Sequence, residues 1–78
     1  MNHPNEIAFA ITAIRQYISI RPDAADTVEG IHHWWIQWPS IKETIAVTQA
    51  ALETMKQNGE MESINIANKL LWRKAKSI

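Results

Sequence analysis

The amino-acid sequence predicts a mostly α-helical fold that ends in a small, two-stranded β-hairpin. Two observations support this fold class. Apolar residues recur at helical spacing in three segments, and proline residues separate these segments from one another. After Gly59 the pattern changes to a loose alternation of apolar and polar residues, which is typical of strands. A chain of 78 residues is long enough for one hydrophobic core, so we expect residues 1–78 to form a single domain.

The first predicted helix begins near Pro4, a residue that favours the first helical position, and ends at about Ser19, before an Arg-Pro pair. Its isoleucines share one face, and they are Ile7, Ile11, Ile14 and Ile18. A second apolar group lies on the opposite side and consists of Phe9, Ala13 and Ile20, with Tyr17 at its flank. Because a helix in a small domain buries one stripe against the core, this second group is left for another contact.

Residues 26–29 (Asp-Thr-Val-Glu) match a capping box at the start of the second predicted helix, in which Asp26 caps the helix and Glu29 reaches back to the cap. This helix ends before Pro39, because the residue that precedes a proline disfavours the helical conformation. Gly30 lies inside the helix, where glycine costs about 1 kcal/mol relative to alanine. We therefore expect another part of the backbone to cross the helix closely at Gly30.

Residues 40–43 (Ser-Ile-Lys-Glu) repeat the capping-box pattern, so the third predicted helix spans residues 40–57. Its apolar stripe consists of Ile41, Ile45, Thr48, Leu52 and Met55. Two strands are predicted to follow, at residues 61–66 and 69–74, and the turn between them is expected at Ala67-Asn68.

Tryptophan is the most unusual feature of the composition, since three of the four tryptophans fall within five residues. Trp34 follows Ile31 at helical spacing, and Trp72 lies in the second predicted strand. Large rings fill a small core efficiently, so we expect both Trp34 and Trp72 to be buried. We expect Trp35 or Trp38 to be an exposed anchor for a partner.

The order of three helices and a hairpin, with a tight corner after the second helix, resembles that of the winged helix-turn-helix family. Residues 50–61 are similar to the end of a recognition helix that runs into the first wing strand. Residues 26–31, with the two tryptophans that follow, are similar to the scaffold helix. The corner at residues 36–40 differs, since it is longer than the usual turn and holds Trp38-Pro39 in place of glycine. The resemblance implies that the third helix enters the major groove of DNA and that the hairpin contacts the DNA backbone or minor groove.

Composition narrows the classes of function. Eight Lys and Arg balance eight Asp and Glu, so the formal net charge is zero and a polyanion-coating role is disfavoured. The absence of cysteine excludes disulfides, thiol nucleophiles and cysteine-bound metals, and it favours a reducing compartment. No motif supplies an activated nucleophile or a paired acid and base, and the apolar run at residues 7–14 is too short to cross a membrane. We therefore expect a cytoplasmic, non-catalytic protein with no cofactor and no membrane contact.

Histidine-based metal sites are not expected either. His32 and His33 are adjacent in the second predicted helix and point about 100° apart, so they cannot share an ion. The segment Met1-Asn2-His3 carries the amine, amide and imidazole nitrogens that bind copper or nickel in a plane, as any terminus with histidine at position three does. We predict no metal site.

Two classes of function remain. The first is a protein-interaction module or adaptor, which the surplus of apolar surface favours, and its expected interface residues are Phe9, Ala13, Tyr17, Ile20 and Trp38. The second is a transcriptional regulator that binds duplex DNA through helix 40–57 and the basic wing, as the family resemblance implies. Its expected contact residues are Lys42, Gln49, Lys56, Lys69, Arg73 and Lys74. Protein interaction ranks first, because a net charge of zero weakens the attraction to phosphates.

Self-association as a homodimer through the first helix is a further expectation. Two antiparallel copies would cross at Ala13, and Phe9 of each copy would cover the far end of the other helix in a self-complementary two-fold contact. The alternative is that the hairpin or residues 75–78 cover this side of the helix within one chain.

Overall fold

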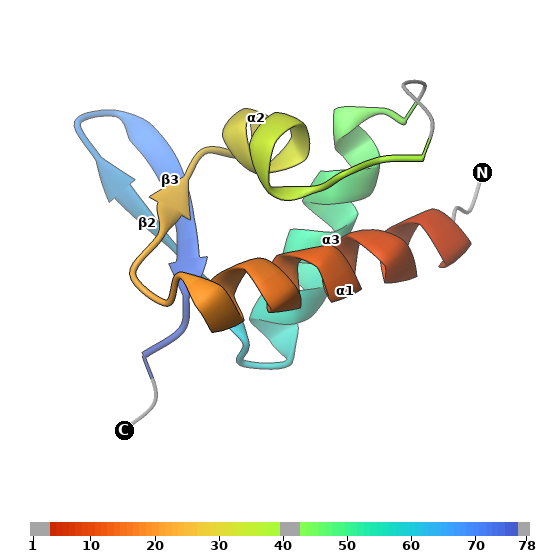
Figure 1. The fold of residues 1–78 in the computed structure, drawn as a ribbon. Coiled ribbons are helices and arrows are strands. Elements are labelled where there is room, and N and C mark those ends of the chain that lie inside the picture. Colours follow the sequence, from red (N-terminus) through yellow and green to blue (C-terminus); the bar gives the residue numbers. More distant parts are fainter. Residues whose placement is uncertain (1–3, 40–42, 77–78) are drawn as a thin grey trace.

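The computed structural model describes residues 4–39 and 43–76, and the elements in these two ranges confirm the predicted fold class (Figure 1). In chain order the elements are α1 (Pro4–Ile20), β1 (Ala25–Asp26), α2 (Val28–Gly30), the π-helical turn η1 (Ile31–Trp35), α3 (Ile45–Gln57), β2 (Met61–Ile66) and β3 (Lys69–Lys74). Because η1 continues α2 without a break, the helical part consists of the three helices that the sequence predicts.

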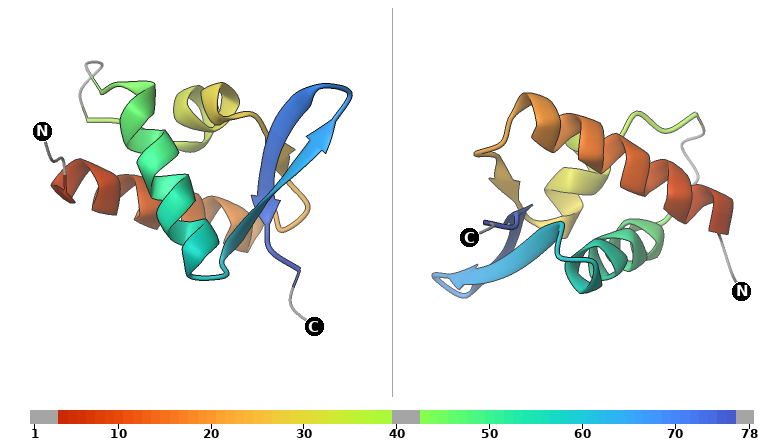
Figure 2. Two further views of the ribbon diagram at one scale, coloured as in Figure 1. Left: turned by 180° about the vertical axis from the view of Figure 1, so that it is seen from behind. Right: turned by 90° about the horizontal axis from the view of Figure 1, so that it is seen from below.

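The hairpin belongs to a three-stranded antiparallel sheet with the order β1-β3-β2. The sequence does not predict β1, whose residues Ala25 and Asp26 pair with Arg73 and Trp72 of β3. Figure 2 shows the hairpin extending away from the helices, with β1 beside the part of β3 that is nearest to them. This arrangement is compatible with a winged-helix-like topology.

The turn of the hairpin lies at Ala67 and Asn68, as predicted. Ile66 pairs with Lys69 across a two-residue loop, and the two loop residues have φ angles of 51° and 67°. Positive φ at both loop positions is typical of a type I′ turn, whose twist matches the right-handed twist of the strands. The predicted strands at residues 61–66 and 69–74 are therefore confirmed.

The hydrophobic core lies between the three helices and the sheet. Its buried residues are Ala10, Ile14, Ile18, Ile31, Trp35, Ile36, Ala51, Leu52, Met55, Met61 and Trp72. On the predicted isoleucine face of α1, Ile14 and Ile18 are buried, while Ile7 and Ile11 pack partly against the core. Trp72 is only 1% exposed, which confirms its predicted place in the core.

The second helix begins one residue later than predicted. Asp26 lies in β1, and its carboxylate accepts a hydrogen bond from the Thr27 N–H at 2.8 Å. Thr27 is the true N-cap, and its hydroxyl oxygen accepts a hydrogen bond from the Gly30 N–H at 3.1 Å. A Cβ at Gly30 would collide with the Asp26 carboxylate. The close neighbour of Gly30 is therefore this side chain and not a crossing backbone.

The third helix begins at Ile45, later than the predicted start at residue 40. Residues 40–42, which hold most of the predicted capping box, lie outside the described residues. Thr44 is the N-cap, with an extended backbone and no capping hydrogen bond from its side chain. The carbonyl oxygen of Glu43 lies 3.1 Å from Nε2 of His32. Because this carbonyl bonds a side chain instead of a helical N–H, the helix starts after it.

The two adjacent tryptophans occupy positions opposite to those expected. Trp34 is 76% exposed and Trp35 is buried, so the prediction that Trp34 fills the core is wrong. The π-helical turn explains this exchange. Hydrogen bonds from residue i to residue i+5 widen the turn, and the wider turn aligns Ile31 with Trp35 instead of Trp34.

We predict that Gly30→Ala lowers the free energy of unfolding by no more than about 1 kcal/mol, because the added methyl group displaces the Asp26 carboxylate, whose side chain can turn away at the cost of its bond to the Thr27 N–H. Alanine in a helix is otherwise favoured over glycine by about 1 kcal/mol. In an Asp26→Ala background the same substitution should therefore be neutral or stabilising. Urea unfolding of the four proteins of this double-mutant cycle measures the coupling. If Gly30→Ala lowers the free energy of unfolding equally in the wild type and in the Asp26→Ala variant, the proposed collision is contradicted.

We also predict that Trp72→Ala lowers the free energy of unfolding by about 3 to 5 kcal/mol, because this substitution empties a large buried volume. Trp34→Ala removes the same kind of side chain from an exposed position, so it should change the free energy of unfolding by no more than about 0.5 kcal/mol in dilute solution. Urea unfolding followed by circular dichroism compares the two variants. If the two variants lose similar amounts of unfolding free energy, the assignment of Trp72 to the core and of Trp34 to the surface is contradicted.

Candidate functional site

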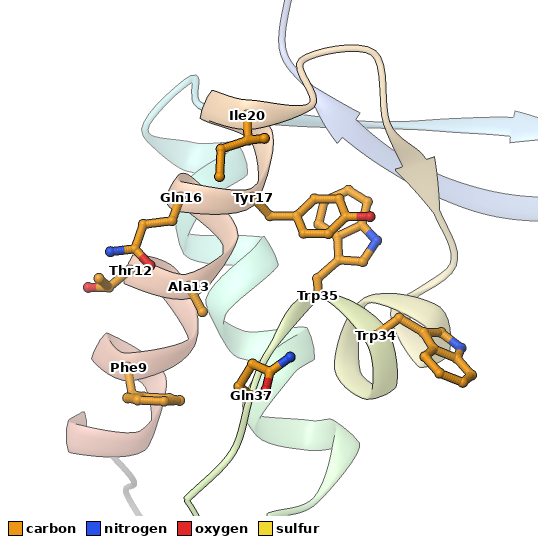
Figure 3. Close-up of a pocket in the computed structure, with 9 residues that line it drawn as sticks. All are labelled: Phe9, Thr12, Ala13, Gln16, Tyr17, Ile20, Trp34, Trp35 and Gln37. Carbon is orange, nitrogen blue, oxygen red and sulfur yellow. The ribbon is translucent and has the colours of Figure 1, made fainter.

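A groove of about 450 Å³ runs along the surface between α1 and η1 (Figure 3). One face of α1 forms one side, and residues of η1 and the segment after it form the other. The lining residues are Phe9, Thr12, Ala13, Gln16, Tyr17, Ile20, Trp34, Trp35 and Gln37. The structure thus brings together every predicted interface residue except Trp38.

The floor of the groove is formed by an aromatic pair. The rings of Tyr17 and Trp35 stack with their centroids 4.3 Å apart and their planes 11° from parallel. Ala13 packs partly against the core beside them. The second apolar group of α1 is therefore partly covered within the chain, and the cover comes from η1. The alternative from the sequence was that the hairpin or residues 75–78 cover this side of α1. Neither the hairpin nor residues 75 and 76 line the groove, and residues 77–78 lie outside the described part of the chain.

The edges of the groove carry large apolar side chains that remain in contact with solvent. Ile20 is 78% exposed at one end of the α1 face, and Phe9 is 40% exposed toward the other end. Trp34 lines the opposite side, and Figure 3 shows that its ring projects on the side of η1 away from α1. Exposed apolar side chains gathered around a hollow are typical of interaction sites, whereas single ones are common on any surface.

Trp38 does not line the groove, but it lines a second hollow together with Phe9. It is half-buried, and its Nε1–H donates a hydrogen bond to the backbone carbonyl of His32 at 3.0 Å. Its ring lies 5.6 Å from that of Phe9, outside the groove. Trp38 therefore fixes the segment after η1, and the exposed tryptophan beside the groove is Trp34.

The groove has no charged side chain in its lining. Its polar groups are the hydroxyls of Thr12 and Tyr17, the amides of Gln16 and Gln37, and the indole N–H groups. The guanidinium of Arg21 lies 5.8 Å from the centroid of the Tyr17 ring, at the carboxyl-terminal end of α1. A surface with this lining suits an apolar partner with a few hydrogen-bonding groups, and Arg21 is a cation beside one end of it.

His32 holds the wall of the groove in place from inside the protein. It is buried, and its Nδ1 lies 2.6 Å from the Thr48 hydroxyl oxygen. Its Nε2 lies 3.1 Å from the Glu43 carbonyl oxygen, which can only accept, so Nε2–H is the donor and Nδ1 accepts from Thr48. Burial lowers the pKa of His32, although the bond to the Glu43 carbonyl opposes this effect in part. The neutral ring links η1 to α3 and to the segment before it.

The cationic residues predicted to contact nucleic acid are spread over several surfaces. Arg73 pairs with Glu62 across the strands at 2.6 Å, and Lys56 donates a hydrogen bond to the Ser63 hydroxyl at 3.3 Å. Successive side chains of a strand point to opposite faces. Lys69 and Arg73 of β3 therefore share one face of the hairpin, and Lys74 lies on the other.

On α3, the amide of Gln49 donates a hydrogen bond to the Glu53 carboxylate at 2.8 Å. Lys42 lies outside the described residues. The structure therefore brings Arg73 and Lys74 together at one hollow, which Lys76 also lines, but it does not gather the remaining predicted contact residues there.

No family model, curated protein or solved structure matches the chain. Within residues 4–39 and 43–76, no helix is long and apolar enough to cross a membrane. In the same part of the chain, no group of three His, Asp or Glu side chains is arranged to hold a metal ion. The segment Met1-Asn2-His3 lies outside it.

Five of the nine lining residues of the groove were not predicted as interface residues, and one of these five, Trp35, was expected only as a candidate exposed anchor. For Thr12 and Gln16 the signal was present, because they are four residues apart and share the α1 face with Phe9 and Ile20. For Trp34 and Gln37 the sequence holds no clear signal, because their positions depend on the π-helical turn.

We predict that lowering the pH from about 7.5 to about 5.5 destabilises the protein through His32. Its pKa is lower in the folded state than the 6.5 of a free histidine, so the unfolded chain binds the proton more readily. This contribution is fully present above pH 6.5 and is lost as the pH falls toward the folded pKa. A His32→Gln variant should be less stable at pH 7.5 and show a weaker pH dependence.

Urea unfolding at the two pH values measures this difference. His33→Gln is the control, because His33 is adjacent and exposed; its charge is a smaller cause of the lowered pKa of His32 than burial is, so this variant should keep most of the wild-type pH dependence. A His32→Gln variant that loses stability as steeply as the wild type would show that His32 is not the responsible group.

Proposed function

We propose that this protein is a small, non-catalytic protein-interaction module that binds its partner in the groove between α1 and η1. The observation that carries the proposal is the combination of a preformed hollow with exposed Phe9, Ile20 and Trp34 around it. Interfaces are enriched in aromatic side chains and depleted of charges at their centre, and the groove has both properties.

The floor of the groove supports binding without a large rearrangement. Tyr17 and Trp35 are already stacked, and Trp35 is buried, so the partner meets a surface whose side chains are held in place. Preorganised side chains lose little conformational entropy on binding. The exposed residues at the edges, Ile20 and Trp34 above all, are then the groups whose burial drives association.

DNA binding as a winged-helix transcriptional regulator is the alternative function. The winged-helix-like order of the elements and the exposed Lys69 and Lys74 favour it. The cross-strand pair of Arg73 with Glu62 and the bond of Gln49 to Glu53 weigh against it, because both place a carboxylate beside a group that DNA would need. Binding to random duplex at about 50 mM salt, weakened by Lys69→Ala and Lys74→Ala, would support this alternative.

Site-specific photocrosslinking in the producing cell tests the proposed function. A benzophenone amino acid at Gln16 lies in the groove and should form a discrete covalent adduct with a protein. The same group at Gln57, an exposed glutamine at the end of α3, is the matched control and should not form it. Adding Trp34→Ala to the Gln16 variant should weaken the adduct, because it removes exposed apolar surface beside the groove.

The absence of any adduct from Gln16, or an equal adduct from Gln57, would contradict the proposal. The mass of the adduct reports the partner, since an adduct of twice 8.9 kDa is a pair of identical chains.

A further inference from the structure

We propose that the partner in the groove is a second copy of this chain, held with the two α1 helices antiparallel. This inference rests on the proposed function of the groove and specifies its occupant. Three features of the described residues support it: the pairing of residues along α1, the distribution of charge around the two-fold axis, and the apolar area at the edges.

The α1 face of the groove is complementary to itself in the antiparallel direction. A two-fold axis between residues 14 and 15 places Phe9 of one copy opposite Ile20 of the other. The same axis sets Ala13 opposite Gln16, whereas Thr12 and Tyr17 share a height along the axis but lie about 140° apart around the helix, on opposite flanks of the contact. Phe9 and Ile20 are separated by about 16 Å along the helix, on a rise of 1.5 Å per residue. Each exposed end is thus covered by the partner's opposite end, and the small Ala13 lies near the crossing.

The charges around this axis permit such a pair. Groups near a two-fold axis face their own copies, so a charge there would repel itself. The groove lining has none. Arg15 is the charged residue nearest to the axis along α1, and its guanidinium is directed to the Glu60 carboxylate, with Nη2 2.7 Å from Oε1. Arg21 lies at the helix end, so the antiparallel arrangement keeps its two copies far apart.

The exposed area predicts a weak dimer. A large aromatic side chain buries about 150 to 250 Å², so the 40% exposed fraction of Phe9 leaves about 60 to 100 Å² of ring surface per copy, and Trp34 contributes only where the partner reaches past η1. Ile20 and the polar lining residues add to this buried area. The area buried by the two copies together falls near or below about 1,200 Å², the lower limit for stable complexes. We therefore expect a dissociation constant in the micromolar range and a monomer in dilute solution.

Sedimentation equilibrium at protein concentrations from about 10 to 500 µM tests the inference. The decisive step compares two variants that each carry one new charge at an end of the contact with a mixture of the two. Phe9→Lys and Ile20→Glu, each alone, should raise the dissociation constant about tenfold or more, because each places a charge against an apolar residue at both ends. Mixing the two variants should restore association. In the mixed dimer the introduced lysine and glutamate face each other at one end, and the native Phe9 and Ile20 meet at the other.

Gln57→Glu is the control for an added surface charge and should associate like the wild type. Circular dichroism and thermal melting establish that each variant is folded. If Phe9→Lys does not fold, Ile20→Glu alone still decides the test, because Ile20 is 78% exposed and its substitution should not disturb the fold. A wild type that stays monomeric to about 500 µM overturns the inference. So does dimerisation that Ile20→Glu leaves unchanged.

The outcome also separates this inference from the function on which it rests. A monomeric wild type that forms an adduct of another mass from Gln16 retains the interaction module but requires a different protein in the groove. A monomeric wild type with no adduct from Gln16 contradicts both.

Discussion

The placement of the groove depends on one buried side chain, His32. Its two ring nitrogens bond the Thr48 hydroxyl on α3 and the Glu43 carbonyl before α3, and its own carbonyl accepts the indole N–H of Trp38. These three bonds connect the π-helical turn to the next helix and to the chain between them. They also hold Trp35 against the core and leave Trp34 in solvent. Ile31 and Trp35 anchor η1 in the core, and Trp35 stacks on Tyr17 of α1, so the bonds of His32 add directional contacts to this hydrophobic packing.

The same link explains why one helix serves two surfaces. Ile14 and Ile18 of α1 face the core, whereas Tyr17 faces the stacked ring of Trp35 on the other flank. The chain thereby covers the middle of the second apolar face and leaves both ends, Phe9 and Ile20, partly or largely open. A domain of this size buries only about 60% of its unfolded surface, so some apolar area remains for a partner. Among the described residues, three of the five exposed large apolar side chains (Phe9, Ile20 and Trp34) lie around one hollow, and the other two, Ile66 and Leu70, lie on the hairpin.

Local rules of the sequence were sufficient for much of this architecture. The alternation after Gly59 and the two-residue loop predicted both strands of the hairpin, and helical spacing predicted the core positions of Ile14 and Ile18. The features that sequence reasoning missed depend on long-range contacts. β1 has only two residues and is stabilised by pairing with β3, which no local pattern reveals. The exchange of Trp34 and Trp35 follows from the π-helical turn, and the late start of α3 follows from a carbonyl bonded to His32. Most of the groove on α1 was predictable, while the η1 wall was not.

The turn of the hairpin also bears on how the strands are stabilised. Ala67 adopts a φ of 51°, and a left-handed conformation costs an alanine about 1 to 2 kcal/mol because of its Cβ. The pairing of β3 with β1 and the burial of Trp72 and Met61 must compensate for that cost. The hairpin therefore draws part of its stability from the sheet and the core, because an isolated two-stranded hairpin is at best marginally stable in water.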